Sequence, residues 1–451
     1  MHKVLIANRG EIALRVIRAC RELGLASVAV FSTADQEALH VRRADEAICI
    51  GPPHARESYL NVAAILQAAR HTGADAVHPG YGFLAENPLF AAACREESLV
   101  FVGPRPEVIA SMGDKAEARR LAAGVGVPTL PGTEGTASPA EVLEVAAEIG
   151  YPVMIKASAG GGGRGIRAAR DPDELADLVA HAAQEAGAAF GDESLYLEKL
   201  LVEARHVEVQ VLGDSYGNLI HLFERECSLQ RRRQKLLEEA PAPALTAQTR
   251  AAMTDAALRL ARAASYENAG TIEFLLDRDG SFYFIEMNTR IQVEHPVTEL
   301  VTGVDLVKEQ LRIAGGEPLG IAQEEVALNG AAIEVRINAE DPGRAFLPSP
   351  GEITTLELPG GPGVRVDTAA FAGYRVPPFY DSLIAKLICW GRDREEAIAR
   401  TRRALEEFEI GGIHTTIPFH LELLEDAAVQ AGDYHVEFLE RRAAEADRMP
   451  A

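Results

Sequence analysis

The chain has 451 residues, of which 47% are hydrophobic and 25% charged, as in a globular protein that is too long for a single core. Its formal net charge of -22 argues against a nucleic-acid partner held through phosphate contacts. The five cysteines are widely spaced and form no CxxC pair, which predicts reduced thiols in a cytoplasmic protein without a zinc site or a disulfide framework. We expect no membrane span, because no segment is long and apolar enough.

The first part of the chain alternates short apolar runs with amphipathic segments. The apolar runs predict strands at 3–8, 27–32, 45–50, 75–80 and 99–103. Helices are expected between them, from Ile12 to a stop at Gly24, then at 59–73 and 88–97. This alternation predicts an open α/β sheet over roughly the first 110 residues.

Later segments rich in proline, glycine and threonine divide the rest of the chain. Such breaks lie at 124–139, 238–248 and 358–366. A strand pair is expected around 271–287, and a final, mostly β region with one helix near 394–408.

Residues 156–167, "KASAGGGGRGIR", contain four consecutive glycines. They match GxGxxG, but an extended segment follows, and the next helix begins only after Asp171 as its N-cap, so a dinucleotide fingerprint is excluded. The pattern predicts a strand–loop–strand flap whose backbone N–H groups can approach phosphate oxygens, with the charge of Lys156 at its base. The alternative is a flexible surface turn.

A second informative stretch, 271–296, contains Asp279 and Gly280 between two alternating runs, which indicates a hairpin. A two-residue turn there makes Glu273 and Glu286 direct cross-strand neighbours, about 5 Å apart at Cβ. Two like charges so close predict a cation between them, and oxygen ligands favour Mg²⁺ or Mn²⁺.

From Glu286 onward, every second residue is polar, up to Glu294. If this segment is extended, one face carries Glu286, Asn288, Arg290, Gln292 and Glu294. The alternative is a half-exposed strand with a solvated face. The basic stretch 227–235, "CSLQRRRQK", is either a solvated surface run or a source of cations for a small anion.

Seven motifs together resemble biotin carboxylase, of the ATP-grasp superfamily, from residue 4 to about 440. They are "IANRGEIA" (6–13), "HPGYGFLAEN" (78–87), "MGDK" (112–115), "KASAGGGGRGI" (156–166), "EAPAP" (239–243), "FIEMNTRIQVEHPVTE" (284–299) and "RINAEDP" (336–342). The resemblance implies an α/β and α+β multidomain fold. We expect a Rossmann-like domain at 1–112, an ATP-grasp domain at 113–330 with a glycine-rich hairpin lid at about 131–203, and a mainly β domain at 331–445.

The resemblance also implies an activity: MgATP and bicarbonate form carboxyphosphate, which carboxylates N1′ of biotin on a separate carrier. The ATP site implied in this way comprises Lys115, Lys156, Gly162, Gly163, Glu198, Lys199, Leu201, His206, Gln230, Arg233 and Leu275. Two Mg²⁺ or Mn²⁺ ions are implied at Glu273, Glu286 and Asn288. The implied bicarbonate pocket contains Lys235, Arg290, Gln292, Val293 and Glu294, and biotin is implied at Tyr81 and Arg336.

Four of these residues are implied to be catalytic: Lys235, Arg290, Glu294 and Arg336. Glu294 matches the general base that deprotonates bicarbonate, and Arg336 matches the arginine that stabilises the biotin enolate. Two residues depart from the common family pattern. Arg233 replaces a histidine, which we expect to change nucleotide affinity, and Ala159 replaces a fifth glycine in some relatives, which stiffens the flap.

The partners follow from the same resemblance. No methionine neighbours a lysine, so the biotin carrier and the carboxyltransferase are expected on other chains, with this chain as a homodimer. The favoured holoenzyme is acetyl-CoA carboxylase, and propionyl-CoA, other acyl-CoA or two-chain pyruvate carboxylases are alternatives. The remaining hypotheses are an ATP-grasp ligase with another acceptor and a nucleotide-binding regulatory subunit.

Overall fold

The computed structural model describes residues 1–133, 135, 137–157, 167–190 and 195–446. The N-terminal part is a parallel sheet in the order β3-β2-β1-β4-β5. Its strands are β1 (Lys3–Ile6), β2 (Ala26–Ser32), β3 (Glu46–Gly51), β4 (Ala76–His78) and β5 (Val100–Phe101). The predicted open α/β sheet is therefore confirmed, although the strand expected at 99–103 is shorter.

Helices α1 (Gly10–Glu22), α3 (Val62–Thr72) and α4 (Pro88–Glu96) connect these strands as predicted, and the short α2 (Leu39–Arg43) was not expected. The face of α1 that carries Ile12, Val16 and Ile17 is buried. The side chains of Asn61 and Asn87 accept hydrogen bonds from the first turns of α3 and α4, which fixes where those helices begin.

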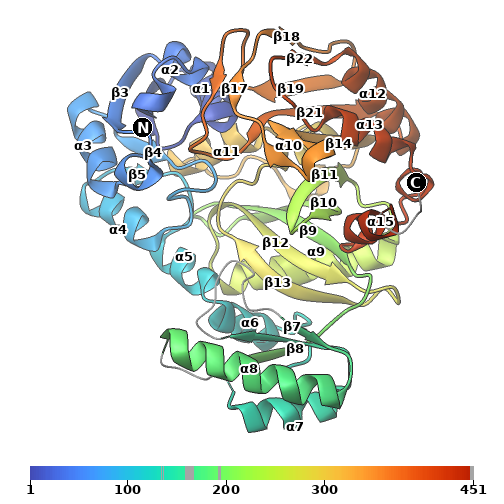
Figure 1. Cartoon of the computed structure of the whole chain (residues 1–451). Coiled ribbons are helices and arrows are strands. Elements are labelled where there is room, and N and C mark those ends of the chain that lie inside the picture. Colours follow the sequence, from blue (N-terminus) through green and yellow to red (C-terminus); the bar gives the residue numbers. More distant parts are fainter. Residues whose placement is uncertain (134, 136, 158–166, 191–194, 447–451) are drawn as a thin grey trace.

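The centre of the molecule is an eight-stranded sheet in the order β13-β12-β9-β10-β11-β14-β21-β19 (Figure 1). Its strands are β9 (Arg205–Gly213), β10 (Leu219–Arg231), β11 (Gln234–Ala240), β12 (Asn268–Leu276), β13 (Phe282–Asn288), β14 (Ala331–Asn338), β19 (Val364–Thr368) and β21 (Leu383–Gly391). Neighbouring strands of this sheet pair antiparallel. The domain boundary expected between residues 330 and 331 lies between strands of this one sheet.

Helices cover this sheet and link it to the N-terminal part. They are α5 (Pro106–Gly113), α6 (Lys115–Gly124), α9 (Ala247–Ala263), α10 (His295–Thr302) and α11 (Leu306–Ala314). In the C-terminal part, α12 (Arg394–Glu407) confirms the predicted helix, and α13 (Ile417–Glu425), α14 (Ala427–Ala431) and α15 (Phe438–Ala446) were not expected. The small strands there are β15 (Glu340–Asp341), β16 (Leu347–Pro348), β17 (Gly351–Glu352), β18 (Thr355–Glu357), β20 (Arg375–Val376) and β22 (Glu409–Gly411). No helix among the described residues is long and apolar enough to cross a membrane.

A small three-stranded unit lies apart from the central sheet, at the bottom of Figure 1. It consists of β6 (Val153–Ala157), β7 (Arg167–Ala169) and β8 (Leu195–Lys199), with α7 (Pro139–Ile149) and α8 (Pro172–Phe190) against it. Strand β6 pairs antiparallel with β7, so the strand–loop–strand prediction holds. Asp171 caps α8 as predicted, since its side chain accepts a hydrogen bond from the backbone of Glu174 at 2.9 Å. The role of this unit as a lid stays a prediction.

The β12–β13 hairpin places Glu273 opposite Glu286, as the sequence predicted, but its turn length and its register differ from the prediction. The turn has three residues, not two, because the backbone N–H of Asp277 donates to the carbonyl of Ser281 at 2.8 Å. A register shift between Glu273 and Phe274 then compensates for the extra turn residue. The prediction of a two-residue turn was wrong, whereas the predicted pairing is confirmed because the two deviations cancel.

Candidate active site

A cleft of about 1410 Å³ opens between the N-terminal sheet, the central sheet and the small three-stranded unit. Every predicted site residue with a described side chain lines it: Tyr81, Lys115, Glu198, Lys199, Leu201, His206, Gln230, Arg233, Lys235, Glu273, Leu275, Glu286, Asn288, Arg290, Gln292, Val293, Glu294 and Arg336. Gly162 and Gly163 lie outside the described residues, and Lys156 is described only as part of β6. The predicted residues that the structure describes therefore come from all parts of the chain and line one cleft.

The polar residues that follow β13 reach the cleft by a bend. The prediction that the segment stays extended to Glu294 was wrong, because β13 ends at Asn288 and α10 begins at His295. Glu86 accepts hydrogen bonds from the backbone of Thr289 at 3.1 Å and from Arg290 Nε at 2.9 Å. These contacts tie the bend to the N-terminal part, so the polar side chains converge through folding and not through strand alternation.

Glu294 is 2% exposed and joins two cations that belong to different strands. Its Oε1 lies 2.5 Å from Nζ of Lys235 on β11, and its Oε2 lies 2.9 Å from Nη2 of Arg336 on β14. Burial alone would raise the pKa of this carboxyl, but Lys235, Arg336 and Arg225 hold it well below its ordinary value. Glu294 is therefore ionised at neutral pH.

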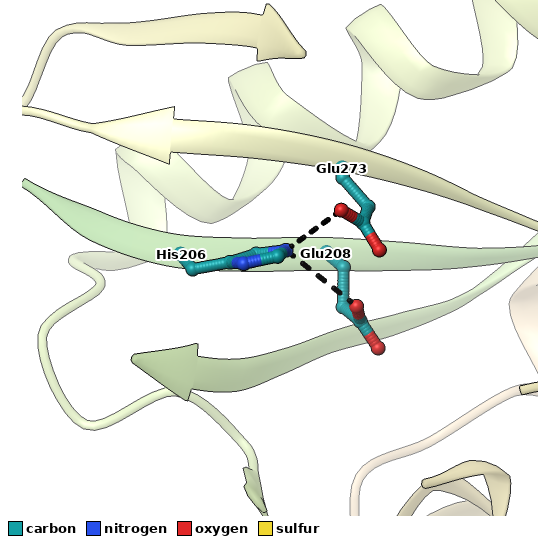
Figure 2. A group of neighbouring side chains, drawn as sticks. All are labelled: His206, Glu208 and Glu273. Carbon is teal, nitrogen blue, oxygen red and sulfur yellow. Dashed lines mark ion pairs between the residues drawn. The ribbon is translucent and has the colours of Figure 1, made fainter. Parts of the chain in front are cut away.

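Glu273 and His206 form the next part of the site. His206 Nε2 lies 3.0 Å from Glu273 Oε2 and 3.8 Å from Glu208 Oε2, and Figure 2 shows its ring facing both carboxylates. Asn288 and Gln292 donate to Glu273 Oε1 at 2.8 and 3.0 Å. Burial opposes ionisation of Glu273, but Lys235 and His206 lower its pKa, so it carries a charge.

The donor set suits a hard cation. Glu273 and Glu286 face each other across two strands, and the amide of Asn288 lies beside them on the same strand as Glu286. Carboxylate and amide oxygens are the ligands that Mg²⁺ and Mn²⁺ take in proteins. Glu286 is also 3.2 Å from Nζ of Lys115, which places the lysine predicted to hold phosphate beside this acidic pair. His206, Glu208 and Glu273 form a second group whose ligand atoms lie within 4.8 Å of one another.

A hairpin turn in the wall of the cleft positions the basic stretch. Strands β10 and β11 pair Arg231 with Gln234, and both turn residues, Arg232 and Arg233, have positive φ, of 50° and 66°. Arg233 lines the cleft at the tip of this turn. The side chain of Gln230 forms a hydrogen bond with His206 Nδ1 at 2.8 Å, so the predicted nucleotide residues contact one another.

Several buried residues that support the site were missed by the sequence analysis. Arg225 is fully buried on β10, and its guanidinium contacts Glu208 at 2.7 Å and Gln292 Oε1 at 2.7 Å. Glu238 accepts from Arg336 Nε at 2.6 Å. The one available signal was a run of charged residues inside the otherwise apolar β10, in "LFERECSL".

A buried lysine links two predicted substrate residues. Lys386 on β21 donates to the carbonyl of Val293 at 2.7 Å and lies 3.1 Å from Glu11 Oε1. The same oxygen of Glu11 accepts from the hydroxyl of Tyr81. The bend that carries Val293 is thus tied to Tyr81, which is predicted to contact biotin.

Known proteins match this chain over nearly its whole length. The models of the N-terminal and C-terminal domains of biotin carboxylase match residues 1–109 and 334–441, and the ATP-binding domain of the carbamoyl-phosphate synthase L chain matches 114–322. Biotin carboxylase 1 of Bacillus subtilis is 57% identical over 440 residues, which cover 97% of this chain and 98% of that protein. The chain belongs to the biotin carboxylase family.

Two further relatives are similar to this member of the biotin carboxylase family over almost its whole length. A pyruvate carboxylase subunit of Methanothermobacter thermautotrophicus is 53% identical over 99% of this chain and 91% of its own. The biotin carboxylase domain of the Hydrogenobacter thermophilus 2-oxoglutarate carboxylase, a dimer crystallised with MgADP, ADP and bicarbonate, is 50% identical, with a TM-score of 0.91 and 99% of each chain covered. The ATP-grasp fold class is shared with these relatives, as the sequence predicted.

A buried carboxyl beside the site gives this biotin carboxylase a testable pH dependence. Burial of Glu226 raises its pKa to about 7, although Arg205 lies 3.6 Å away. Between about pH 4.5 and 7 the folded carboxyl keeps a proton that the unfolded chain releases, so the free energy of unfolding falls as pH rises. We expect Glu226→Gln to remove about 2 kcal/mol of this fall between pH 5 and 8. Urea unfolding of both proteins at the two pH values measures it, and equal pH dependence would contradict it.

Proposed function

We propose that this chain catalyses the ATP-dependent carboxylation of biotin on a biotin carboxyl carrier protein, with bicarbonate as the carbon source and carboxyphosphate as the intermediate. The observation that carries the proposal is the position of Glu294 between Lys235 and Arg336. Lys235 suits the anionic bicarbonate, and Arg336 suits the negative charge that develops on biotin. The base between them therefore lies next to the groups that would hold both substrates.

In the first step, Lys235 and Arg290 hold bicarbonate as two cations hold a small planar anion. Gln292 and the backbone N–H of Val293 complete the pocket in this proposal. The ionised Glu294 removes the proton of bicarbonate, so that its oxygen attacks the γ-phosphorus of ATP, and ADP leaves. Bicarbonate must compete with Glu294 for Lys235, because these two side chains are 2.5 Å apart in the structure.

Lys115, Lys156 and the backbone of Gly162 and Gly163 would hold the phosphates of ATP, and Glu198, Lys199, Leu201, His206, Gln230, Arg233 and Leu275 the nucleoside. Glu273, Glu286 and Asn288 would hold the two Mg²⁺ or Mn²⁺ ions, which neutralise charge on the transferred phosphoryl group when bound. Closure of the small three-stranded unit over ATP would keep water from carboxyphosphate.

In the second step, the carboxyl group of carboxyphosphate is transferred to N1′ of biotin, phosphate is released, and the N1′ proton passes to that phosphate. Arg336 would stabilise the negative charge that builds on the ureido oxygen, and Tyr81 would contact the ring. Arg336 is held for this role by Glu238 and Glu294, at 2.6 and 2.9 Å.

The test is ADP release with MgATP and bicarbonate, with and without free biotin. We expect biotin to stimulate turnover of the wild type, and we expect Arg336→Met to lose that stimulation, because methionine keeps the stem without the charge. Arg375→Met is the matched control, since Arg375 is exposed and its side chain pairs only with the exposed Glu352 among the described residues. Turnover that depends on bicarbonate but not on biotin would favour an ATP-grasp ligase with another acceptor.

The partners and location are part of the proposal. A carrier protein would present biotin, a carboxyltransferase would use carboxybiotin, and the chain would act in the cytoplasm as a homodimer. Acetyl-CoA carboxylase is the favoured holoenzyme. Because similar chains are named for pyruvate and 2-oxoglutarate carboxylases, the same half-reaction in such enzymes is the second candidate.

A further inference from the structure

We propose that Asn338 recognises the ureido ring of biotin, and so determines specificity for the acceptor. The inference rests on the proposed function and deepens it, because it names the part of the acceptor that this side chain contacts. None of the roles assigned above uses Asn338, although it lines the same cleft as Arg336.

The backbone holds Asn338 at a fixed place in the wall of the cleft. It lies two residues after Arg336 on β14, and both residues line the cleft, although the pairing of β14 with β21 shifts register between Ile337 and Asn338. Its N–H donates to Thr416 Oγ1 at 3.0 Å, and its carbonyl accepts from the N–H of Thr416 at 3.1 Å. Asn338 is therefore presented beside the cation that is proposed to face the ureido oxygen.

The amide of Asn338 lacks a partner within the part of the chain that the structure describes. The residue is 8% exposed, and Oδ1 is buried without a hydrogen bond. The other buried amides of the cleft differ: Asn288 and Gln292 donate to Glu273, and Gln230 contacts His206. Buried polar groups are almost always paired, so this amide is complementary to a ligand group.

The ureido ring of biotin supplies the missing partner. It has one carbonyl oxygen and two N–H groups, of which the reaction uses N1′ and leaves N3′–H to be paired. Near Arg336, Glu294 is already bound to that arginine. Glu238 and Glu334 have unpaired oxygens, but neither residue lines the cleft. Glu11 also has an unpaired oxygen, but its other oxygen is shared by Lys386 and Tyr81.

A neutral amide suits this position better than a carboxylate. An amide oxygen accepts the N3′–H hydrogen bond without adding negative charge beside the enolate that Arg336 stabilises. The amide can also turn to offer its NH₂ group to the ureido oxygen. Asn338 would therefore bind the acceptor and leave the charge balance at Arg336 unchanged.

Steady-state kinetics with free biotin test the inference. We expect Asn338→Ala to raise the KM for biotin about tenfold, the effect of one lost hydrogen bond, with a much smaller change in the KM for ATP. Asn338→Asp keeps the accepting oxygen, so its KM for biotin is expected to lie closer to wild type, while its kcat falls because of the added charge. Asn329→Ala is the control, since that side chain is exposed.

A biotin analogue methylated at N3′ makes the test specific. The wild type is expected to prefer biotin to this analogue at least tenfold in kcat/KM, and Asn338→Ala is expected to lose most of that preference, which a merely structural residue would not cause. Equal preference in both proteins, or a KM for biotin in Asn338→Asp as high as in the alanine variant, would overturn the inference. If the alanine variant does not fold, the aspartate variant decides. Absence of biotin-stimulated turnover in the wild type would instead refute the proposed function.

Discussion

Replacing Glu294 with glutamine is expected to lower bicarbonate-dependent ADP release by about 100-fold to 10,000-fold, the range for loss of a general base. Glutamine has the same shape but cannot accept a proton from bicarbonate. The fold is expected to survive, because each cation keeps another carboxylate. Lys235 still contacts Glu208 at 2.6 Å, and Arg336 still contacts Glu238.

The measurement is the turnover rate at saturating ATP and bicarbonate, with ATP binding measured separately by calorimetry. Glu96→Gln is the matched control, because Glu96 is exposed at the end of α4 and does not line the cleft. ATP affinity should stay within a few-fold of wild type in both variants. Turnover of Glu294→Gln within tenfold of wild type would mean that another group removes the proton.

Replacing Arg225 with methionine is expected to lower the free energy of unfolding by about 3–5 kcal/mol, the usual cost of breaking a buried ion pair from one side. Arg225 and Glu208 are both fully buried, with 2.7 Å between Nε and Oε1. The same guanidinium bonds Gln210, Thr271, Thr298 and Gln292 at 2.7 to 3.1 Å. Methionine satisfies none of these five oxygen acceptors.

Urea unfolding measures this loss, and Arg402→Met is the matched control. Arg402 is exposed on α12 and pairs with the exposed Glu406 and Glu425, where an ion pair contributes about 1 kcal/mol or less. Arg225→Lys should lie between the two variants, because lysine keeps the charge without the planar fork. Since Gln292 loses its Arg225 contact, the KM for bicarbonate should also rise in Arg225→Met. A loss of stability no larger than in the control would show that the buried network is not needed for the fold.

Local patterns determined much of this protein from the sequence alone. The alternation of apolar runs and helices predicted the N-terminal sheet, because each strand and helix needs only its own neighbours to bury its apolar face. Asp171 predicted the start of α8 for the same local reason. The long motifs identified the family, and with it the residues that line the cleft.

Tertiary structure decided how those residues meet. Glu273 faces Glu286 only because a longer turn and a register shift cancel, and no local pattern encodes that compensation. The bend after Asn288 depends on Glu86 and Lys386, which come from opposite ends of the chain. The sequence alone assigned no role to Arg225 or Asn338. Arg225 is the centre of a buried hydrogen-bond network, and Asn338 has an unpaired amide oxygen. Both result from the packing of segments far apart in the chain, which excludes water.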